Sequence, residues 1–582
     1  MPIRDHGTLV EPSGIRFRVW APKAGRLAVR IDGADHPLSP AQDGWFEGLV
    51  PGARDGTRYA LSADGGPERP DPASARQPEG VHGPSEVFDA GRHAWTDAGW
   101  RGLPLEELVL YELHVGTFTA EGTLDAAAAR LPDLVALGVT CVELMPLQPF
   151  AGDRNWGYDG VSLRAVHEGY GGPAALQRFV DRAHALGLGV CLDVVYNHLG
   201  PEGNYLTAYG PYLTPRHRSP WGDGLDYDGP GSAPVRELMV GAAVRWIRDF
   251  HVDALRLDAT HAIEDASARH LVAEIAAAVR EAGDAAGRRA HVIAEDDRND
   301  RKILEPPPRG WGASAVWADD LHHAVHALLT GERHAFLADF GRPEDVARAL
   351  AEGFAYQGEP SRYRRRRHGT PTSGLAPSRF VTCLQNHDQV GNRPAGERIA
   401  SLVPWEALLP ASALVLLGSG TPLLFMGEEY GETAPFPYFT SHSDPALARA
   451  VSEGRKKEYI AKGAHDVPDP QDPETFRRSK LSHRRDGRHG VLREHYRRLL
   501  ALRRRHRAAI AAGWPEVQRD GTAFALRRPG LVVRANLAPA PAGGLGPWGV
   551  EVREQERGVE RALGDDPRAL ERGEAEGPAP RE

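Results

Sequence analysis

Charged and imidazole side chains stand at the ends of four short apolar runs in this chain. The segments are DVVYNH with Asp193 and His198, ALRLDA with Arg256 and Asp258, VIAEDD with Glu295, and QNHD with His387 and Asp388. Cleavage of a glycosidic bond needs two carboxyl groups, one to protonate the leaving oxygen and one to attack the sugar or activate water. These residue types predict chemistry of that kind if the fold brings the four segments together.

The segment RLD carries an arginine and an aspartate on one side of an expected strand, because side chains alternate along a strand. A neighbouring Arg256 lowers the pKa of Asp258 and keeps it ionised. An ionised carboxylate in a water-poor cleft can act as a nucleophile. A structural ion pair inside the core fits RLD alone equally well. We interpret Asp193 as structural, orienting Arg256, rather than as catalytic.

Glu295 ends the apolar run VIA. Apolar neighbours and a second carboxylate raise the pKa of a carboxyl group, and a raised pKa suits a general acid. Asp296 and Asp297 follow directly, so the residues alone leave open which of the three acids serves.

Eight apolar runs alternate with helix-length segments, which is the pattern of parallel β/α units. The runs are VLYELHVGTF, VTCVELMPL, GVCLDVVYNH, ALRLDA, HVIAED, AVWADD, FVTCLQNHD and PLLFMGEEYG. The pattern predicts an α/β fold with a (β/α)8 TIM barrel, in which chemistry lies at the C-terminal ends of the strands. Such barrels take about 250 residues, so we expect loop insertions here, as between residues 197 and 234.

Composition divides the rest of the chain. Residues 1–98 contain short alternating runs that predict an N-terminal β-sandwich. We assign residues 99–500 to the catalytic barrel, 501–552 to a small C-terminal β domain and 553–582 to a polar tail that is partly helical or disordered.

Charge and apolar content limit the classes of partner. The chain has 582 residues and a net charge of −9, which argues against nucleic acid and fits a neutral substrate. The basic run 364–367 is interpreted as a solvated loop on the barrel rim. The apolar stretch 407–426 is broken by GSGTP, which predicts a buried helix, a turn and a buried strand rather than a membrane span.

The cysteines and the N-terminus indicate the compartment. Cys141, Cys191 and Cys383 are widely spaced in apolar runs, so we expect buried thiols rather than disulfides or a zinc site. The N-terminal segment has no apolar core of a signal peptide. Together these features predict a cytoplasmic protein.

The four segments, in this order, resemble the four signature segments of the α-amylase superfamily of glycoside hydrolases. The resemblance implies that Asp258 is the nucleophile, Glu295 the general acid/base and Asp388 the third carboxylate, which holds sugar hydroxyls. It implies further substrate contacts. These are Arg256, which keeps the nucleophile ionised, His198 and His387, which hydrogen-bond the sugar, Tyr158 of WGYDG, which stacks on it, and His261, which faces the cleft.

Further segments are similar to the maltooligosyltrehalose trehalohydrolase family, over most of residues 10–500. They include PDPASARQPEGVHGPSEV, MPLQPFAGDRNWGYDGV, AEDDRND, LQNHDQVGNR and FMGEEYGETAPFPYFTSHSDPAL. The resemblance implies retaining hydrolysis of the α-1,4 bond between a maltooligosyl chain and a terminal trehalose, in a pathway with a maltooligosyltrehalose synthase. It implies no cofactor and no metal, because Leu199-Gly200-Pro201 follows Asn197 as in members that need no calcium.

Two other functions stay open at this point. A branching enzyme or other α-glucan transferase would use the same carboxylates with a sugar acceptor in place of water. A non-catalytic glucan-binding protein would not need Asp258, Glu295 and Asp388 intact. For trehalose recognition, the candidate rim segments are 152–159, 317–323 and 428–438.

Overall fold

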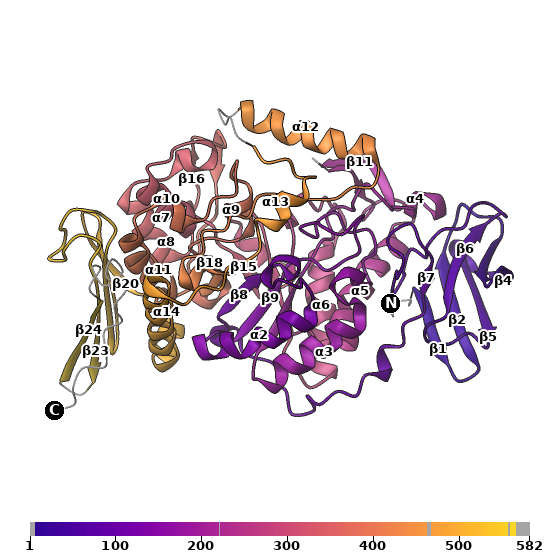
Figure 1. Cartoon of the computed structure of the whole chain (residues 1–582), viewed down its shortest axis with the longest axis horizontal. Coiled ribbons are helices and arrows are strands. Elements are labelled where there is room, and N and C mark those ends of the chain that lie inside the picture. Colours follow the sequence, from indigo (N-terminus) through magenta and orange to yellow (C-terminus); the bar gives the residue numbers. More distant parts are fainter. Residues whose placement is uncertain (1–5, 220, 462–466, 557–558, 566–582) are drawn as a thin grey trace.

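A computed structural model of the chain describes residues 6–219, 221–461, 467–556 and 559–565. Figure 1 shows an N-terminal sheet at one end, a barrel with its helices in the middle and a small C-terminal sheet at the other end. The predicted fold class, a (β/α)8 barrel flanked by two β domains, is confirmed.

Eight strands form a closed barrel in which all neighbours pair in parallel. They are β8 (Leu110–Leu113), β9 (Cys141–Leu144), β10 (Gly189–Val194), β13 (Ala254–Leu257), β14 (His291–Ala294), β15 (Ala315–Trp317), β18 (Phe380–Cys383) and β19 (Thr421–Phe425). Seven of them lie within the predicted runs, and β19 begins one residue before its run, at Thr421. Nearly all their residues are buried, because helices cover the outside of a parallel barrel and side chains fill its interior.

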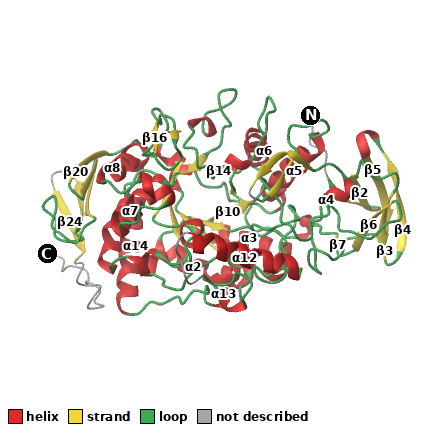
Figure 2. Cartoon of the chain, turned by 90° about the horizontal axis from the view of Figure 1, so that it is seen from above, coloured by secondary structure: helices red, strands yellow, loops and turns green. Residues whose placement is uncertain are grey.

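Helices follow the barrel strands and pack around them, as the red ribbons of Figure 2 show. They are α2 (Leu124–Leu137), α3 (Gly172–Ala185), α5 (Ala233–Asp249), α6 (Leu271–Ala285), α7 (Asp320–Thr330), α8 (Pro343–Glu352), α11 (Leu408–Leu416) and α14 (Gly487–Arg505). The α14 helix packs on α2 and α11. The boundary expected at residue 500 therefore falls inside a helix of the barrel.

Shorter elements lie in the loops between these strands and helices. The helices are α1 (Val115–Phe118), α4 (Leu206–Tyr209), α9 (His387–Gly391), α10 (Ile399–Leu402), α12 (Pro445–Ala461), α13 (Pro473–Arg477) and α15 (Arg507–Ala511). Two hairpins pair β11 (Leu213–Ser219) with β12 (Gly222–Leu225), and β16 (Glu359–Ser361) with β17 (Arg366–His368). The β11–β12 hairpin lies in the expected insertion between residues 197 and 234.

The N-terminal sheet has the order β1-β2-β5-β4-β3-β6-β7 with antiparallel pairing. Its strands are β1 (Gly7–Glu11), β2 (Gly14–Trp20), β3 (Leu27–Ile31), β4 (Ala34–Pro40), β5 (Trp45–Pro51), β6 (Arg58–Ala63) and β7 (Ser85–Glu86). Although β2 and β6 are not neighbours in the sheet, the rings of Phe17 and Tyr59 meet at 4.9 Å. The two halves of the sheet therefore face each other across an apolar core.

A connector over residues 95–103 runs under the barrel, where the purple chain of Figure 1 passes from the N-terminal sheet to β8. Asp97 accepts from the imidazoles of His184 and His251, at 2.8 and 2.7 Å. Asp253 is 2.9 Å from the other ring nitrogen of His184 and accepts from Trp100 Nε1 at 2.7 Å. These buried polar contacts fasten the connector to α3 and to the start of β13.

The C-terminal sheet is an antiparallel meander in the order β20 to β24. Its strands are β20 (Glu516–Asp520), β21 (Ala523–Arg528), β22 (Leu531–Asn536), β23 (Val550–Glu556) and β24 (Val559–Asp565). The sheet therefore continues past residue 552, where the sequence placed the start of a polar tail. β23 and β24, which hold this charged stretch, are thus part of a small sheet: β23 pairs with β22 and with β24, and β24 is the outer strand. The rest of the expected tail, residues 566–582, lies outside the described residues.

The apolar stretch 407–426 forms α11, a turn and β19, all buried. Among the described residues, no helix combines the length and apolar character needed to cross a membrane. The three cysteines are unpaired and buried in β9, β10 and β18, in one apolar cluster inside the barrel.

Candidate active site

Three carboxylates converge on one guanidinium at the C-terminal end of the barrel. Arg256 Nη1 lies 2.8 Å from Asp258 Oδ1, and Arg256 Nη2 lies 3.7 Å from Glu295 Oε2 and 3.9 Å from Asp388 Oδ2. Asp258 follows β13, Glu295 follows β14 and Asp388 stands in α9 just after β18. The arginine side chain is fully buried, whereas the carboxylates are 11%, 14% and 39% exposed in that order. The acids therefore surround a buried positive charge, and each is partly open to solvent.

Arg256 is held in place by Asp193 and by the ring of Trp317. Its Nη1 donates to both oxygens of Asp193, at 3.0 and 2.9 Å. The guanidinium carbon lies 4.2 Å from the ring centre of Trp317, a distance at which a cation is attracted to the aromatic face. Burial alone would favour the neutral form of Asp193 and raises its pKa to about 6, against the pull of Arg256. Asp193 is positioned to orient the arginine rather than to meet a substrate.

Asp258 is held as a carboxylate. Its Oδ2 accepts from Asn197 Nδ2 at 2.6 Å, and its backbone oxygen accepts from the same amide at 2.8 Å. Burial works against the charge, but Arg256, His198 and the Asn197 hydrogen bond together lower the pKa of Asp258. An ionised, oriented carboxylate at the cleft can attack an electrophilic carbon.

Glu295 has the opposite character. Burial raises its pKa well above the ordinary value, and the charges of Asp258 and Asp388 add to the rise against the opposing charge of Arg256. Its Oε2 accepts from the backbone N–H of Ala259 at 2.5 Å. A carboxyl group that keeps its proton at neutral pH can act as a general acid.

The two aspartates after Glu295 point elsewhere. Asp296 is buried and accepts from the hydroxyl of Thr260 at 2.8 Å and from the guanidinium of Arg298. Asp297 accepts from Arg364 Nη1 at 2.8 Å. Of the three acids that the sequence left open, only Glu295 shares the cluster around Arg256. Arg364 is half-buried against Asp297, so only part of the basic run 364–367 is a solvated loop.

A chain of hydrogen bonds links Tyr158 to the barrel interior. The Tyr158 hydroxyl donates to Asp193 Oδ2 at 2.6 Å and accepts from His387 Nε2 at 2.8 Å. His387 Nδ1 donates to Glu112 Oε1 at 2.5 Å. Burial lowers the pKa of His387, but Asp388 and Glu112 outweigh it and raise the value to about 9. The imidazole is therefore a cation at neutral pH, and its neighbour Asp388 lies 3.5 Å from Nε2.

Two further predicted histidines lie at the edge of the site. His198 donates through Nε2 to the backbone oxygen of Tyr158 at 3.0 Å, and its ring stacks on Trp221 at 4.6 Å. His261 is half-buried in the turn after β13, with Nδ1 3.9 Å from Asp297. The structure thus groups Tyr158, His198 and the carboxylates around one cleft and places His261 at its border.

Sequence reasoning missed Glu112 and Asn197 as parts of the site. Glu112 is fully buried in β8, and its carboxylate accepts from His387 Nδ1 and, through Oε2, from the His387 backbone N–H at 2.9 Å. A single acidic residue inside the apolar run VLYELHVGTF was the available signal, because a buried carboxylate needs a partner. Asn197 had been considered only as a calcium ligand.

A pocket lies on the side of Arg256 where the guanidinium meets the Trp317 ring. Its lining includes Trp317, Asp319 and His323 from the predicted rim segment 317–323, together with Asp297 and Arg364. Burial, with Asp388 and other acids nearby, raises the pKa of Asp319 to about 7. Within the described part of the chain, no group of three or more His, Cys, Asp or Glu residues could hold a metal ion.

The sequence and structure are similar to known proteins over nearly the whole chain. The family described as alpha amylase, catalytic domain, matches residues 87–218. Malto-oligosyltrehalose trehalohydrolase of Rhizobium sp. (strain M-11) is 47% identical, with 90% of this chain and 91% of that protein covered. The protein of that name from Saccharolobus solfataricus is 43% identical, with 82% and 83% covered. A crystal structure described as a putative alpha amylase from Salmonella typhimurium superposes with a TM-score of 0.87 at 42% identity, with 92% and 94% covered.

The parallel barrel, the carboxylates at its C-terminal end and the catalytic-domain match define an α-amylase-type glycoside hydrolase. The resemblance noted in the sequence extends further than this class. At 43% identity or more over most of both chains, the protein belongs to the malto-oligosyltrehalose trehalohydrolase family.

Proposed function

We propose that the protein hydrolyses the α-1,4 bond between the maltooligosyl chain and the terminal trehalose of maltooligosyltrehalose, and that it retains the configuration at the cleaved carbon. The observation that carries the mechanism is the opposite pKa shift of two acids that both lie beside Arg256. The pKa of Asp258 is lowered and the pKa of Glu295 is raised. These directions suit a nucleophile and a proton donor, respectively.

In the first step, the Asp258 carboxylate attacks the anomeric carbon while Glu295 gives its proton to the glycosidic oxygen. The bond to trehalose breaks, trehalose leaves and a glycosyl ester forms on Asp258. Asp388, the most exposed of the three acids, is placed to hold sugar hydroxyls as the oxocarbenium-like transition state forms.

In the second step, the Glu295 carboxylate takes a proton from water, and the hydroxide attacks the same carbon. The ester bond to Asp258 breaks, and both acids return to their starting states. Arg256 stays charged throughout and stabilises Asp258 as the leaving carboxylate, since its guanidinium remains 2.8 Å away.

The groups around Tyr158 form the binding surface for the sugar that is cleaved. Tyr158 is half-buried, and two hydrogen bonds fix its hydroxyl group. We assign sugar hydrogen bonds to His198 and His387, and a lesser contact to His261. Arg256 keeps Asp258 ionised, and Asp193 orients Arg256, so neither needs to contact the sugar directly.

Trehalose selectivity is proposed from family membership and from the shape of the leaving group. Because trehalose is joined 1,1, its last glucose leaves the path of an α-1,4 chain. A rim that fits this bend can use binding energy in the transition state for that bond alone. The segments 152–159, 317–323 and 428–438 are the candidates for this rim. The substrate is the product of a maltooligosyltrehalose synthase, and we place both reactions in the cytoplasm, in keeping with three unpaired buried cysteines.

The test compares kcat/KM for maltooligosyltrehalose and for plain maltooligosaccharides of equal length, with products separated by chromatography. We expect free trehalose as the product, and a preference for maltooligosyltrehalose of about tenfold or more. Equal rates on both substrates would exclude trehalose selectivity and leave the mechanism intact. New α-1,6 branches as the main product would instead identify a branching enzyme.

A further inference from the structure

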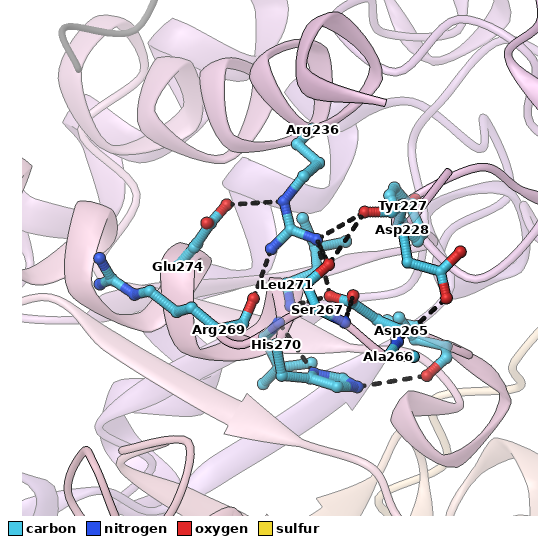
Figure 3. Close-up of polar contacts among 12 residues, drawn as sticks. Tyr227, Asp228, Arg236, Asp265, Ala266, Ser267, Arg269, His270, Leu271 and Glu274 are labelled. Atoms are coloured by element: carbon cyan, nitrogen blue, oxygen red, sulfur yellow. Dashed lines mark hydrogen bonds and ion pairs between the residues drawn. The ribbon is translucent and has the colours of Figure 1, made fainter. Parts of the chain in front are cut away.

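Arg236 in α5 is the centre of a polar cluster that includes the loop between β13 and α6, shown in Figure 3. Its side chain is 11% exposed, and each of its three nitrogens donates a hydrogen bond. Nε donates to Glu274 Oε2 at 3.1 Å, Nη1 to Asp265 Oδ2 at 2.7 Å and Nη2 to the backbone oxygen of Arg269 at 2.7 Å. These three partners lie in the loop after β13 or in α6, which follows it.

The same loop begins at the proposed nucleophile, Asp258. Asp265 holds the other end of this loop, because its carboxylate accepts from the backbone N–H groups of Ser267 and Leu271 at 2.9 and 2.7 Å. The side chain of Asp265 is completely buried. Arg236 therefore neutralises the buried charge that fixes the loop and the first turn of α6.

A second path leads from Arg236 to the nucleophile through Tyr227. Arg236 Nη1 donates to the Tyr227 backbone oxygen at 2.8 Å, and the buried Tyr227 hydroxyl donates to the Tyr196 backbone oxygen at 2.6 Å. Asn197, the next residue, donates to Asp258 at 2.6 Å. Both the loop that carries Asp258 and the amide that orients it are thus tied to one guanidinium.

The backbone is strained at Ala259, the residue that follows Asp258 and contacts Glu295. Ala259 has φ 39° and ψ 54°, in the left-handed region that residues with a Cβ atom avoid. In this conformation its N–H points at Glu295 Oε2, 2.5 Å away. A strained residue persists only when its surroundings hold it. The fastened loop from Thr260 to Leu271 supplies that support on one side.

We propose that Arg236 is a positioning residue for catalysis. Its hydrogen bonds hold the loop after β13 in place, and this loop keeps Asp258 and the Ala259 N–H at their positions beside Glu295. This inference rests on the proposed roles of Asp258 and Glu295. A hydrogen bond to a carboxylate stabilises the charged form and lowers its pKa. Loosening the loop weakens the Ala259 contact, so the pKa of Glu295 rises and the alkaline limb of the pH–rate profile moves to higher pH.

The test is Arg236→Lys, which keeps the charge but cannot reach all of the partners. We expect kcat to fall about tenfold or more, KM to change little and the alkaline limb to rise by about 0.5–1 pH unit. The charged groups near Glu295 are Arg256, Asp258, Asp388 and Asp319. Both variants keep all four, so a shift of the alkaline limb reports a change in the loop. Asp265→Asn is the second variant, with the same expected direction, in case Arg236→Lys does not fold.

The matched control is Arg245→Lys in the same helix. Arg245 is equally buried and donates to Asp249 at 3.0 Å, but its contacts lie away from the cleft. We expect this variant to lose stability while kcat and the pH profile stay as in the parent. If Arg236→Lys and Asp265→Asn likewise lose only stability, the positioning role is refuted. If the parent itself releases no sugar, or Asp258→Asn remains active, the proposed function fails instead.

Discussion

Replacing Glu112 by glutamine tests whether the buried carboxylate in β8 makes His387 a cation. In the folded protein the pKa of His387 is about 9, against an ordinary value of 6.5. Each unit of pKa shift corresponds to about 1.4 kcal/mol, so the protonated imidazole contributes about 3 kcal/mol to folding. Asp388 and Glu112 both raise this pKa. Glu112→Gln removes one negative charge and replaces one of the two oxygens that accept from His387 by an NH2 group, and we expect a loss of about 1–3 kcal/mol.

The sign of the pH dependence follows from the direction of the shift. A histidine whose pKa is raised by folding stabilises the protein fully below pH 6.5, and this contribution disappears as the pH rises through about 9. Urea denaturation of parent and variant at about pH 6 and about pH 10 measures the difference. We expect a large penalty for Glu112→Gln at the lower pH and a small one at the higher pH.

Glu143→Gln is the matched control, because Glu143 pairs with Glu112 in register on the neighbouring strand. Neither oxygen of Glu143 has a hydrogen-bond partner among the residues that the structure describes, and burial raises its pKa well above the ordinary value. Its neutral substitute should leave the protein at least as stable at about pH 6. A penalty for Glu112→Gln that is equal at both pH values, or larger at the alkaline one, would contradict the proposed charge pairing.

Three further predictions concern the mechanism. Asp258→Asn should keep the fold, measured by circular dichroism, and lose about 10³-fold or more in kcat, because an amide cannot form the glycosyl ester; near-parental turnover would remove Asp258 from its role. Glu295→Gln should lower kcat by about 10²–10⁴-fold and abolish the alkaline limb of the pH–rate profile, and a larger loss in Asp296→Asn or Asp297→Asn would mean that the wrong acid was chosen. Dialysis against a chelator should leave both activity and Tm unchanged, and a loss restored by calcium would reveal an ion that the mechanism requires.

The barrel could be predicted from the sequence because its strands are continuous apolar runs separated by helix-length segments. Each run is short, buried on both sides and followed by polar residues, so both its limits are visible. The C-terminal sheet was harder to delimit. Charged residues make up half of the chain from residue 553 onward, and an edge strand such as β24 can share this composition with a solvated tail.

The candidate site could be predicted only in part. Strand alternation was enough to place Arg256 beside Asp258, and the structure has them 2.8 Å apart. No local pattern distinguishes Glu295 from the two acids that follow it, because the choice depends on where Thr260 and Arg364 lie in space. The role of Glu112 depends on a contact with a residue 275 positions away.

The connector under the barrel determines where the chain can be cut or recombined without loss of the fold. The segment that precedes the connector is rich in proline and glycine, as linkers often are. Within the connector, however, Asp97 and Trp100 form hydrogen bonds with His184, His251 and Asp253. A fragment that begins at β8 would lose these hydrogen bonds to His184 Nδ1, His251 Nδ1 and Asp253 Oδ1, at a cost of about 1–3 kcal/mol for each buried atom left unpaired. The connector therefore belongs with the barrel rather than with the N-terminal sheet: recombination between relatives should succeed when the crossover lies before residue 95 and fail when it separates the connector from the barrel.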